Sequence, residues 1–111
     1  MVASIPVRLL LKDESVNPSA TNNFALFSSS RYGHIDIVRL LLKDKRVNPS
    51  LGAALELASL NGRVDVVRLL LNDGRIDPSR NNNRALQIAL ENGHKEIAEL
   101  LEADPRVQAL L

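Results

Sequence analysis

The chain has 111 residues, of which 45% are apolar, 24% charged and 3% aromatic, and it contains no cysteine or tryptophan. This length allows one compact domain or a few stacked small units, and the net charge of +1 excludes the basic surplus typical of nucleic-acid-binding proteins. The lack of cysteine excludes disulfides, thiolate catalysis and cysteine-based zinc sites. No apolar run approaches the roughly 20 residues of a membrane span, and the first residues do not form a signal peptide. We therefore expect an intracellular, cytoplasmic protein with no membrane contact.

Four segments of the chain align with one another, which indicates an internal repeat. They read VRLLLKDESVNPS from Val7, VRLLLKDKRVNPS from Val38, VRLLLNDGRIDPS from Val67 and AELLEADPRVQAL from Ala98. Pro18, Pro49 and Pro78 lie 31 and then 29 residues apart, so the unit is about 31 residues long and one copy is two residues shorter. Within a single repeat domain spanning 1–111 we expect a half unit at 1–19 and full units at about 20–48, 49–77 and 78–108.

The half unit is expected to hold one helix, with Ser4 as its cap and Pro6 in its first turn. Each full unit is expected to hold two helices. The first, for example Ala54 to Asn61, places apolar residues at helical spacing between small ones and ends at a glycine, which enters the left-handed conformation without strain. The second, for example Val64 to Leu71, is apolar on nearly every side and therefore needs cover on more than one side.

Helices of about nine residues are not stable alone in water, so their stability must come from stacking of the units. The leucines of the second helices are expected to be covered by adjoining units: Leu40, Leu41, Leu69 and Leu70. The bends between paired helices are expected at Gly33, Gly62 and Gly93. The sequence therefore predicts an all-α solenoid of helix–turn–helix units with about seven short helices.

The seam between units carries Asn or Asp followed by Pro and Ser, at 17–19, 48–50 and 77–79. This order favours a tight turn in which the first side chain bonds to its own backbone. An aspartate also recurs at the end of each second helix: Asp13, Asp44, Asp73 and Asp104. Because a carboxylate there opposes the helix dipole, we predict that it accepts hydrogen bonds from amides of the turn.

The far end of the chain offers a helix start at Asp104-Pro105. The apolar residues that follow, Val107, Leu110 and Leu111, either cover the last unit as a simple cap or form a frayed tail.

No catalytic constellation is recognisable in the sequence. His34 and His94 occupy the same place two units apart, too far apart to share a metal ion, and each is expected to form a local hydrogen bond at the start of a second helix. No histidine and carboxylate are placed to activate a serine, and Ser28 to Ser30 replace small packing residues. Arginines that recur on the second helix, such as Arg39, have acidic neighbours and indicate a solvated mixed-charge face. We therefore expect no catalytic residue, no metal and no cofactor.

The recurring pattern N-N-x-A-L-x-x-A-x-x-N-G-H-x-x-I-V-x-L-L-L, followed by a turn, resembles the ankyrin repeat. The segment from Asn81 to Leu101 carries it most fully, and Asn22 to Leu42 nearly as well. The chain departs from the family where Phe24-Ala25-Leu26-Phe27 replaces Thr-Pro-Leu-His, and again in its shorter turns. The resemblance implies an ankyrin-like solenoid with little or no β-hairpin. Since the chain opens inside a second helix, we expect a fragment of about three and a half repeats from a longer array.

Ankyrin-like proteins bind partners on the concave face formed by the first helices and the turns, so the resemblance implies a non-enzymatic protein-binding module. The implied contact residues are Ala20, Thr21, Asn23, Arg31 and Tyr32 in the first full unit, Gly52, Leu60 and Asn61 in the second, and Arg80, Asn81, Asn83, Glu91 and Asn92 in the third. Tyr32 and Leu60 are the candidate anchors, unless they are partly buried against the next unit. Asn81 to Asn83 either bind the partner or form the turn and cap the helix, and Phe27 is expected in the core.

The resulting prediction is a module that binds a protein partner, not nucleic acid or a small-molecule substrate. The alternative is a structural spacer or capping segment of a longer array, with no partner of its own. An apolar patch on the concave side would favour binding, whereas a uniformly polar concave side with exposed apolar ends would favour a spacer.

Overall fold

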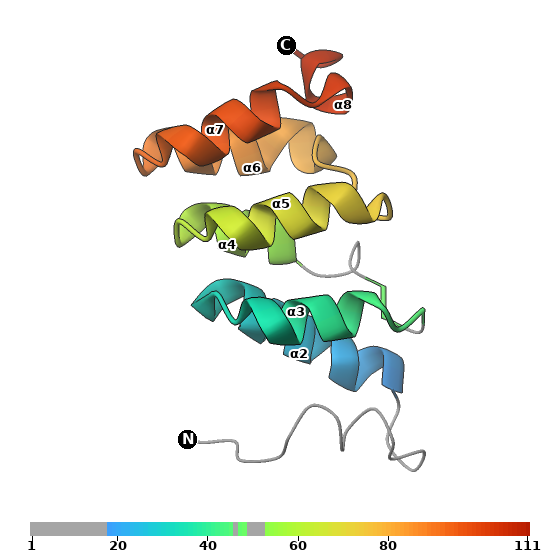
Figure 1. Cartoon of the computed structure of the whole chain (residues 1–111). Helices are drawn as coiled ribbons and strands as arrows, with labels where there is room; N and C mark the ends of the chain where they lie inside the picture. Colours follow the sequence, from blue (N-terminus) through green and yellow to red (C-terminus); the bar gives the residue numbers. More distant parts are fainter. Residues whose placement is uncertain (1–17, 46, 49–52) are drawn as a thin grey trace.

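The computed structural model describes residues 18–45, 47–48 and 53–111. These residues form helices joined by turns and contain no strand, which confirms the all-α prediction. The helices are α2 (Pro18–Tyr32), α3 (Ile35–Leu42), α4 (Ala54–Leu60), α5 (Val64–Asp73), α6 (Arg80–Glu91), α7 (Lys95–Glu102) and α8 (Pro105–Gln108). Figure 1 shows three stacked pairs, α2 with α3, α4 with α5 and α6 with α7, and the short α8 at the C-terminal end. The helix predicted within 1–19 lies outside the described residues.

A glycine ends the first helix of each pair, as predicted. Gly33, Gly62 and Gly93 have φ angles of 75°, 72° and 72°, in the left-handed region. The amide of the next residue then reaches back over the helix end, and the bond from His94 N to Ala89 O, 2.9 Å long, is one of three such bonds. This is the glycine-terminated helix end that satisfies carbonyls left without an intrahelical partner.

The core runs through the stack between the two layers of helices. The second helices contribute Leu41, Leu70 and Leu101, which are fully buried, while Leu40 and Leu69 are half-buried. Leu41 and Leu70 are thus covered as predicted, and Leu40 and Leu69 are covered in part. The first helices contribute small buried residues: Ser29, Ser30, Ala54, Ala58, Ser59, Ala85 and Ala89. Small side chains let successive first helices approach closely, and the packing role predicted for the serines holds for Ser29 and Ser30.

The turns after α5 and α7 are each fixed by the predicted aspartate together with an arginine two residues later. Asp104 Oδ1 accepts a hydrogen bond from Arg106 N at 2.9 Å, and Asp73 Oδ1 accepts one from Arg75 N at 3.3 Å. The side chain of each arginine also donates to the same carboxylate, at 2.7 Å for Arg75 Nε. These hydrogen bonds hold the pKa of Asp73 and of Asp104 below the ordinary aspartate value, against the opposing effect of burial.

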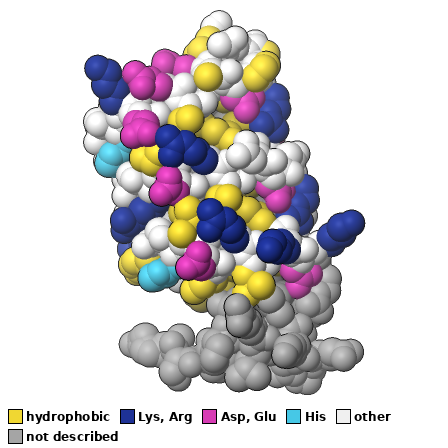
Figure 2. Space-filling view, viewed as in Figure 1, with side chains coloured by type: hydrophobic (Ala, Val, Ile, Leu, Met, Phe, Trp, Pro, Cys, Tyr) yellow, Lys and Arg dark blue, Asp and Glu magenta, His cyan; other side chains and the backbone are white. Residues whose placement is uncertain are grey.

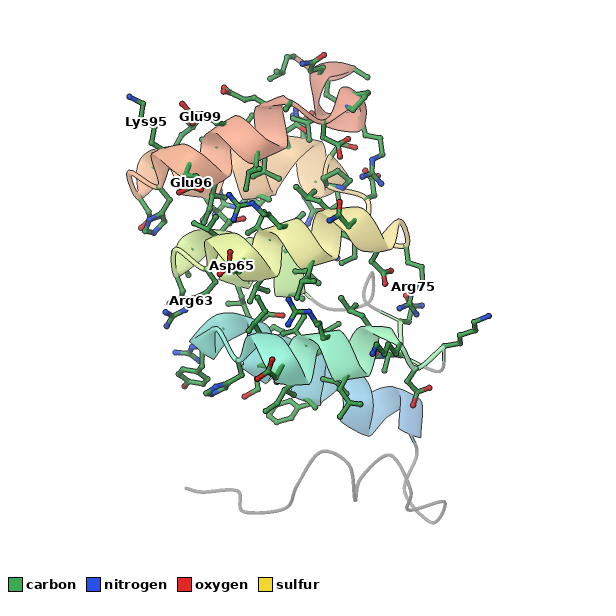
Figure 3. All side chains as sticks on the ribbon, in the orientation of Figure 1. Arg63, Asp65, Arg75, Lys95, Glu96 and Glu99 are labelled. Atoms are coloured by element: carbon green, nitrogen blue, oxygen red, sulfur yellow. The ribbon has the colours of Figure 1, made fainter. Side chains whose placement is uncertain are left out.

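The same arginines also join these two turns to the preceding unit, a contact that no local sequence pattern predicts. Arg75 donates to Val47 O at 2.7 Å and to Leu42 O at 2.6 Å, and Arg106 donates to Ile76 O at 3.0 Å. Figure 3 shows Arg63 and Arg75 at opposite edges of the stack. At the Arg63 edge, the residue after the glycine also donates a hydrogen bond to the preceding unit. Arg63 Nε donates to Arg31 O at 3.2 Å.

His94 bonds to the preceding unit in the same way, because its Nε2 lies 3.0 Å from Leu60 O. The predicted local role of the histidines is thus refined. His34 and His94 do stand at the N-terminal ends of α3 and α7, but the hydrogen bond of His94 crosses to the neighbouring unit. No group of three or more His, Cys, Asp or Glu suited to a metal ion occurs among the described residues.

The first helix begins differently in different units. α2 has fifteen residues, more than the nine expected, because it starts at Pro18 itself. Proline is favoured there since its missing N–H would lack an intrahelical partner. In the third full unit, Asn81, Asn82 and Asn83 instead have φ angles of 53°, 61° and 62°. They form a left-handed turn, which asparagine tolerates better than other side-chain-bearing residues.

The seam before this left-handed turn has the predicted form. Asp77 Oδ1 accepts hydrogen bonds from Ser79 N at 2.9 Å and from Ser79 Oγ at 2.6 Å. The two bonds hold the pKa of Asp77 below the ordinary aspartate value. At the far end, Asp104 caps α8 and Val107 is buried, but Leu110 and Leu111 are exposed. Only the first part of the predicted cap therefore covers the last unit.

The face made by the second helices carries mixed charge, as predicted. Arg68 pairs with Asp65 at 3.0 Å and with Glu96 of the next unit at 2.8 Å, and Arg39 pairs with Asp36 at 3.5 Å. Figure 2 shows both signs of charge interleaved with apolar side chains over this face. Exposed pairs of this kind contribute about 0–1 kcal/mol each, so the face is solvated and is not a basic stripe.

Candidate functional site

The first helices form one layer of the stack, and we call the side of this layer that turns away from the core the inner face. Contacts between α2, α4 and α6 are more extensive than those between α3, α5 and α7. Positions three and four residues apart share one face of a helix. The stripe that turns away from the core contains Phe24, Phe27 and Arg31 on α2, Glu56, Leu57 and Leu60 on α4, and Arg84, Gln87 and Glu91 on α6.

Exposed and half-buried apolar side chains occur on α2 and α4. We call this set the apolar patch: Phe24, Phe27, Tyr32, Leu57 and Leu60. The side chains of Phe24, Tyr32 and Leu60 are 70%, 54% and 43% exposed, and the other two are half-buried. Large exposed apolar side chains gathered on one surface mark an interaction site more often than scattered ones do.

The α6 part of the inner face is polar. Glu56 accepts from Arg80 at 3.3 Å and from Asn81 Nδ2 at 3.4 Å, so both predicted contact residues also join the second and third full units. Gln87 Nε2 donates to Glu91 at 3.3 Å. The inner face therefore changes from apolar to charged and polar along the stack.

Tyr32, the first predicted anchor, is held by its neighbours while its ring stays accessible. The Arg31 guanidinium carbon lies 5.4 Å from the centre of the Tyr32 ring, and the His34 ring lies 6.3 Å away at an angle of 42°. A cation near the ring face attracts it electrostatically. The Tyr32 ring thus lies near Arg31 and His34 and remains more than half exposed.

Leu60, the second predicted anchor, and the asparagines that precede two of the glycines form hydrogen bonds at helix ends. Leu60 offers its side chain to solvent while its carbonyl accepts the hydrogen bond from His94. Asn61 Nδ2 donates to Leu57 O and Asn92 Nδ2 donates to Ile88 O, both at 2.8 Å. These asparagines cap their own helices, and their side chains remain exposed.

Two of the predicted contact residues form hydrogen bonds within their own units. Asn23 Oδ1 accepts from Asn48 N at 2.8 Å, and Asn83 Nδ2 donates to Val107 O at 3.1 Å. Each bond joins the start of a first helix to the turn after the second helix of the same unit. Asn83 is buried, so its assignment as a surface contact is corrected: the left-handed turn directs its side chain inward.

Three further predicted residues have no described side chain. Ala20 and Thr21 belong to α2, and Gly52 lies outside the described residues. Phe27, expected in the core, is half-buried, and the more exposed Phe24 was missed. Phe24 lies three residues before Phe27 and seven before Arg31, so the helical spacing of the inner stripe would have identified it.

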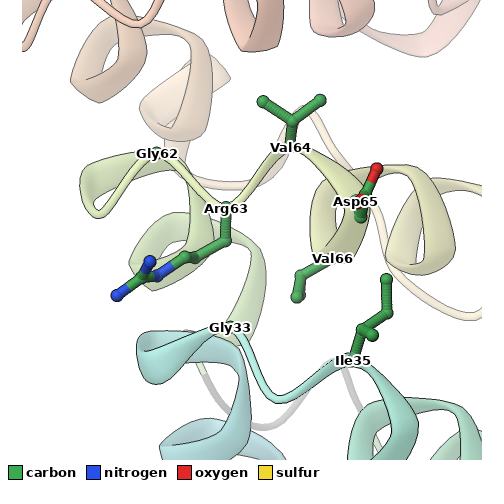
Figure 4. A pocket seen from close by; sticks show the side chains of 7 residues that line it. All are labelled: Gly33, Ile35, Gly62, Arg63, Val64, Asp65 and Val66. Atoms are coloured by element: carbon green, nitrogen blue, oxygen red, sulfur yellow. The ribbon is translucent and has the colours of Figure 1, made fainter.

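A notch separates the ends of the first and second full units near the glycine bends. It has a volume of about 290 Å³ and is lined by glycines, by apolar residues of α3 and α5, and by Arg63 and Asp65. Figure 4 shows the Arg63 side chain extending along the edge of the stack near Gly33, away from Val64 and Val66. One carboxylate and one guanidinium do not form an acid–base pair suited to catalysis, so we assign the notch no chemistry.

Comparison with known families agrees with this architecture. Residues 46–109 match the family described as ankyrin repeats (3 copies), and residues 23–52 match the ankyrin repeat. Searches among curated proteins and among solved structures returned no match. Over the described residues, no helix has both the length and the apolar character to cross a membrane. Since the first of the two matches covers more than half of the chain, and both fall on the stacked helix pairs, the protein belongs to the ankyrin repeat family.

Proposed function

We propose that the protein is a non-enzymatic module that binds a protein partner on its inner face, with Phe24, Tyr32 and Leu60 as the anchors. Ankyrin repeats are generally protein–protein interaction modules. The observation that carries the proposal is the apolar patch on α2 and α4. Exposed aromatic and aliphatic side chains of this kind dominate the energy of protein interfaces.

The fold supports this assignment because it presents the patch in a fixed geometry. The hydrogen bonds from Arg63 to Arg31 O and from His94 to Leu60 O hold the backbone at both predicted anchors. A surface that is already ordered loses less entropy when a partner binds. The polar contacts are then supplied by Arg31, Asn61, Arg80, Asn81, Glu91 and Asn92. The absence of cysteine suits a reducing compartment, which supports an intracellular partner.

The alternative, a spacer in a longer array, is favoured by one observation: Leu90, on the side of α6 that faces away from α4, is 58% exposed. The two functions make different predictions for the inner face. A spacer tolerates substitution of the apolar patch with no loss of interaction, whereas a binding module does not.

The test is capture of interacting proteins from the native cell extract by the immobilised chain. The variant Phe24→Ala/Tyr32→Ala/Leu60→Ala removes the anchors, and Arg39→Ala/Lys43→Ala serves as a matched control on the second-helix face. We expect proteins that bind the wild type and the control to be lost from the triple variant, provided that all three show the same helical circular dichroism. If the triple variant retains the same proteins, the inner face is not the binding surface.

A further inference from the structure

Two of the glycine bends are preceded by asparagine, in the pairs Asn61-Gly62 and Asn92-Gly93. Because glycine carries no side chain, its amide nitrogen can approach the preceding asparagine side chain with little steric hindrance. After loss of its proton, this nitrogen is a nucleophile for the side-chain carbonyl carbon. Asn61 and Asn92 are both exposed to solvent. The two pairs are therefore candidates for deamidation, a modification that needs no enzyme.

The reaction consumes water and releases ammonia. The glycine nitrogen, after giving its proton to a base in the solvent, bonds to the asparagine Cγ. The bond between Cγ and Nδ2 breaks, and Nδ2 takes up a proton and leaves as ammonia. The product is a succinimide ring. Water then adds to one of the ring carbonyls and the C–N bond at that carbon breaks, which gives aspartate or isoaspartate.

The two pairs have nearly the same resting geometry. The ψ angles of Asn61 and Asn92 are 7° and 6°, and the glycines that follow both have a φ angle of 72°. In each pair the asparagine Nδ2 donates to its own helix at 2.8 Å. Ring closure needs an extended ψ, because only then do the glycine nitrogen and the asparagine side chain lie on the same side of the Cα–C bond. Each bend must therefore open before its asparagine can react.

The pairs differ in what covers the glycine. Gly62, shown in the bend between α4 and α5 in Figure 4, lies under the His94 ring of the following unit. A Cβ placed on Gly62 would be 3.0 Å from His94 Cε1, and His94 Nε2 lies 3.0 Å from Leu60 O. Among the described residues, nothing lies within 4 Å of a Cβ placed on Gly93. Opening of the Gly62 bend must therefore displace a ring and loosen its hydrogen bond, whereas opening of the Gly93 bend displaces no cover.

We propose that Asn61 and Asn92 are deamidation sites, and that His94 directs the reaction to Asn92 by holding the Gly62 bend closed. His94 is a positioning residue, since it forms none of the bonds that are made or broken. The rate of such a reaction in a folded chain scales with the fraction of molecules in which the bend is open. Loss of one hydrogen bond between units raises that fraction roughly three- to tenfold, so Asn92 should react faster than Asn61 by about this factor.

Deamidation replaces a helix cap with a charge. A carboxylate accepts hydrogen bonds but cannot donate them, so the bond from Asn92 Nδ2 to Ile88 O is lost. The new negative charge also lies at the C-terminal end of α6, where the helix dipole opposes it. The chain modified at Asn92 should therefore unfold at a lower temperature than the unmodified chain.

The test is incubation of the 111-residue chain in neutral buffer, with deamidation at each asparagine followed by peptide mass spectrometry. We expect Asn92 to react faster than Asn61 in the wild type, and His94→Ala to raise the Asn61 rate roughly three- to tenfold relative to the Asn92 rate. His94→Arg should retain the protection, because Arg63 covers Gly33 in the same way one unit earlier. A Cβ placed on Gly33 would lie 2.9 Å from Arg63 Cδ.

A control variant separates local opening of the bend from a general loss of stability. Arg75→Ala destabilises the stack at its opposite edge, and should leave the ratio of the Asn61 rate to the Asn92 rate unchanged. Circular dichroism checks that every variant is folded during the incubation. Equal rates at the two asparagines of the wild type, a rate ratio that His94→Ala does not change, or no deamidation at either asparagine overturns the proposal.

Discussion

Removal of the Arg75 side chain tests whether the units are held together by the bonds from arginine to the preceding turn. Arg75 donates to two carbonyls of the preceding unit, at 2.7 Å and 2.6 Å, and to its own Asp73. Hydrogen bonds that involve a charged group contribute about 1.5–3 kcal/mol each when they are sheltered. The Arg75 side chain is 34% exposed, so solvent screening reduces this to about 1 kcal/mol per carbonyl. We therefore expect Arg75→Ala to lower the free energy of unfolding by about 2 kcal/mol.

The assay is equilibrium urea denaturation followed by circular dichroism at 222 nm, with Arg68→Ala as the matched control. Arg68 is 48% exposed and bonds to side chains only, so its removal should cost less than about 1 kcal/mol. Arg75→Lys keeps the charge but loses the planar guanidinium that reaches several acceptors. Its loss of unfolding free energy should therefore lie between those of Arg75→Ala and Arg68→Ala. If Arg75→Ala costs no more than Arg68→Ala, the bonds to the preceding unit do not stabilise the stack.

Two further predictions concern the bends and the aspartates. Gly93→Ala should lower the free energy of unfolding by about 1 kcal/mol, because alanine is strained in the left-handed region. Gly62→Ala should cost clearly more, since its Cβ also meets the His94 ring; equal losses in thermal denaturation would contradict this packing. Asp73 and Asp104 have a lowered pKa in the folded chain and the ordinary value when unfolded. The stability that these two carboxylates contribute is therefore complete above the ordinary aspartate pKa, and it is lost as the pH falls through their lowered pKa in the folded chain. Urea denaturation at about pH 6 and about pH 3 should show this loss, and Asp73→Asn/Asp104→Asn should reduce it; an unchanged pH dependence would refute the role of the two carboxylates.

The features that depend on neighbouring residues could be predicted from the sequence. Gly62 had to end a helix because only glycine enters the left-handed region without strain, and Leu70 had to be buried because a short helix needs cover. Asp104 was correctly assigned to the amides of its turn for the same local reason. Periodicity and local backbone chemistry are sufficient for such positions.

The features that depend on distant partners could not be predicted. Arg75 reaches carbonyls 28 and 33 residues earlier in the chain, and no local pattern specifies which acceptor a long side chain meets. Asn83 resembled a surface residue, but a left-handed turn directs its amide to Val107 O. Phe24 differs from these cases, because its helical spacing from Phe27 and Arg31 would have placed it on the inner face.

The hydrogen bonds from a side chain of one unit to a backbone carbonyl of another all run in one direction in the described part of the chain, and this has a consequence for synthesis of the protein. Arg63, Arg75, His94 and Arg106 all belong to the later unit, and the carbonyls that they meet belong to the earlier one. A chain leaving the ribosome therefore exposes each acceptor before its donor has been made. Each pair of helices after the first is therefore synthesised when the unit that carries its acceptor carbonyls already exists, so the stack can form in the order of translation.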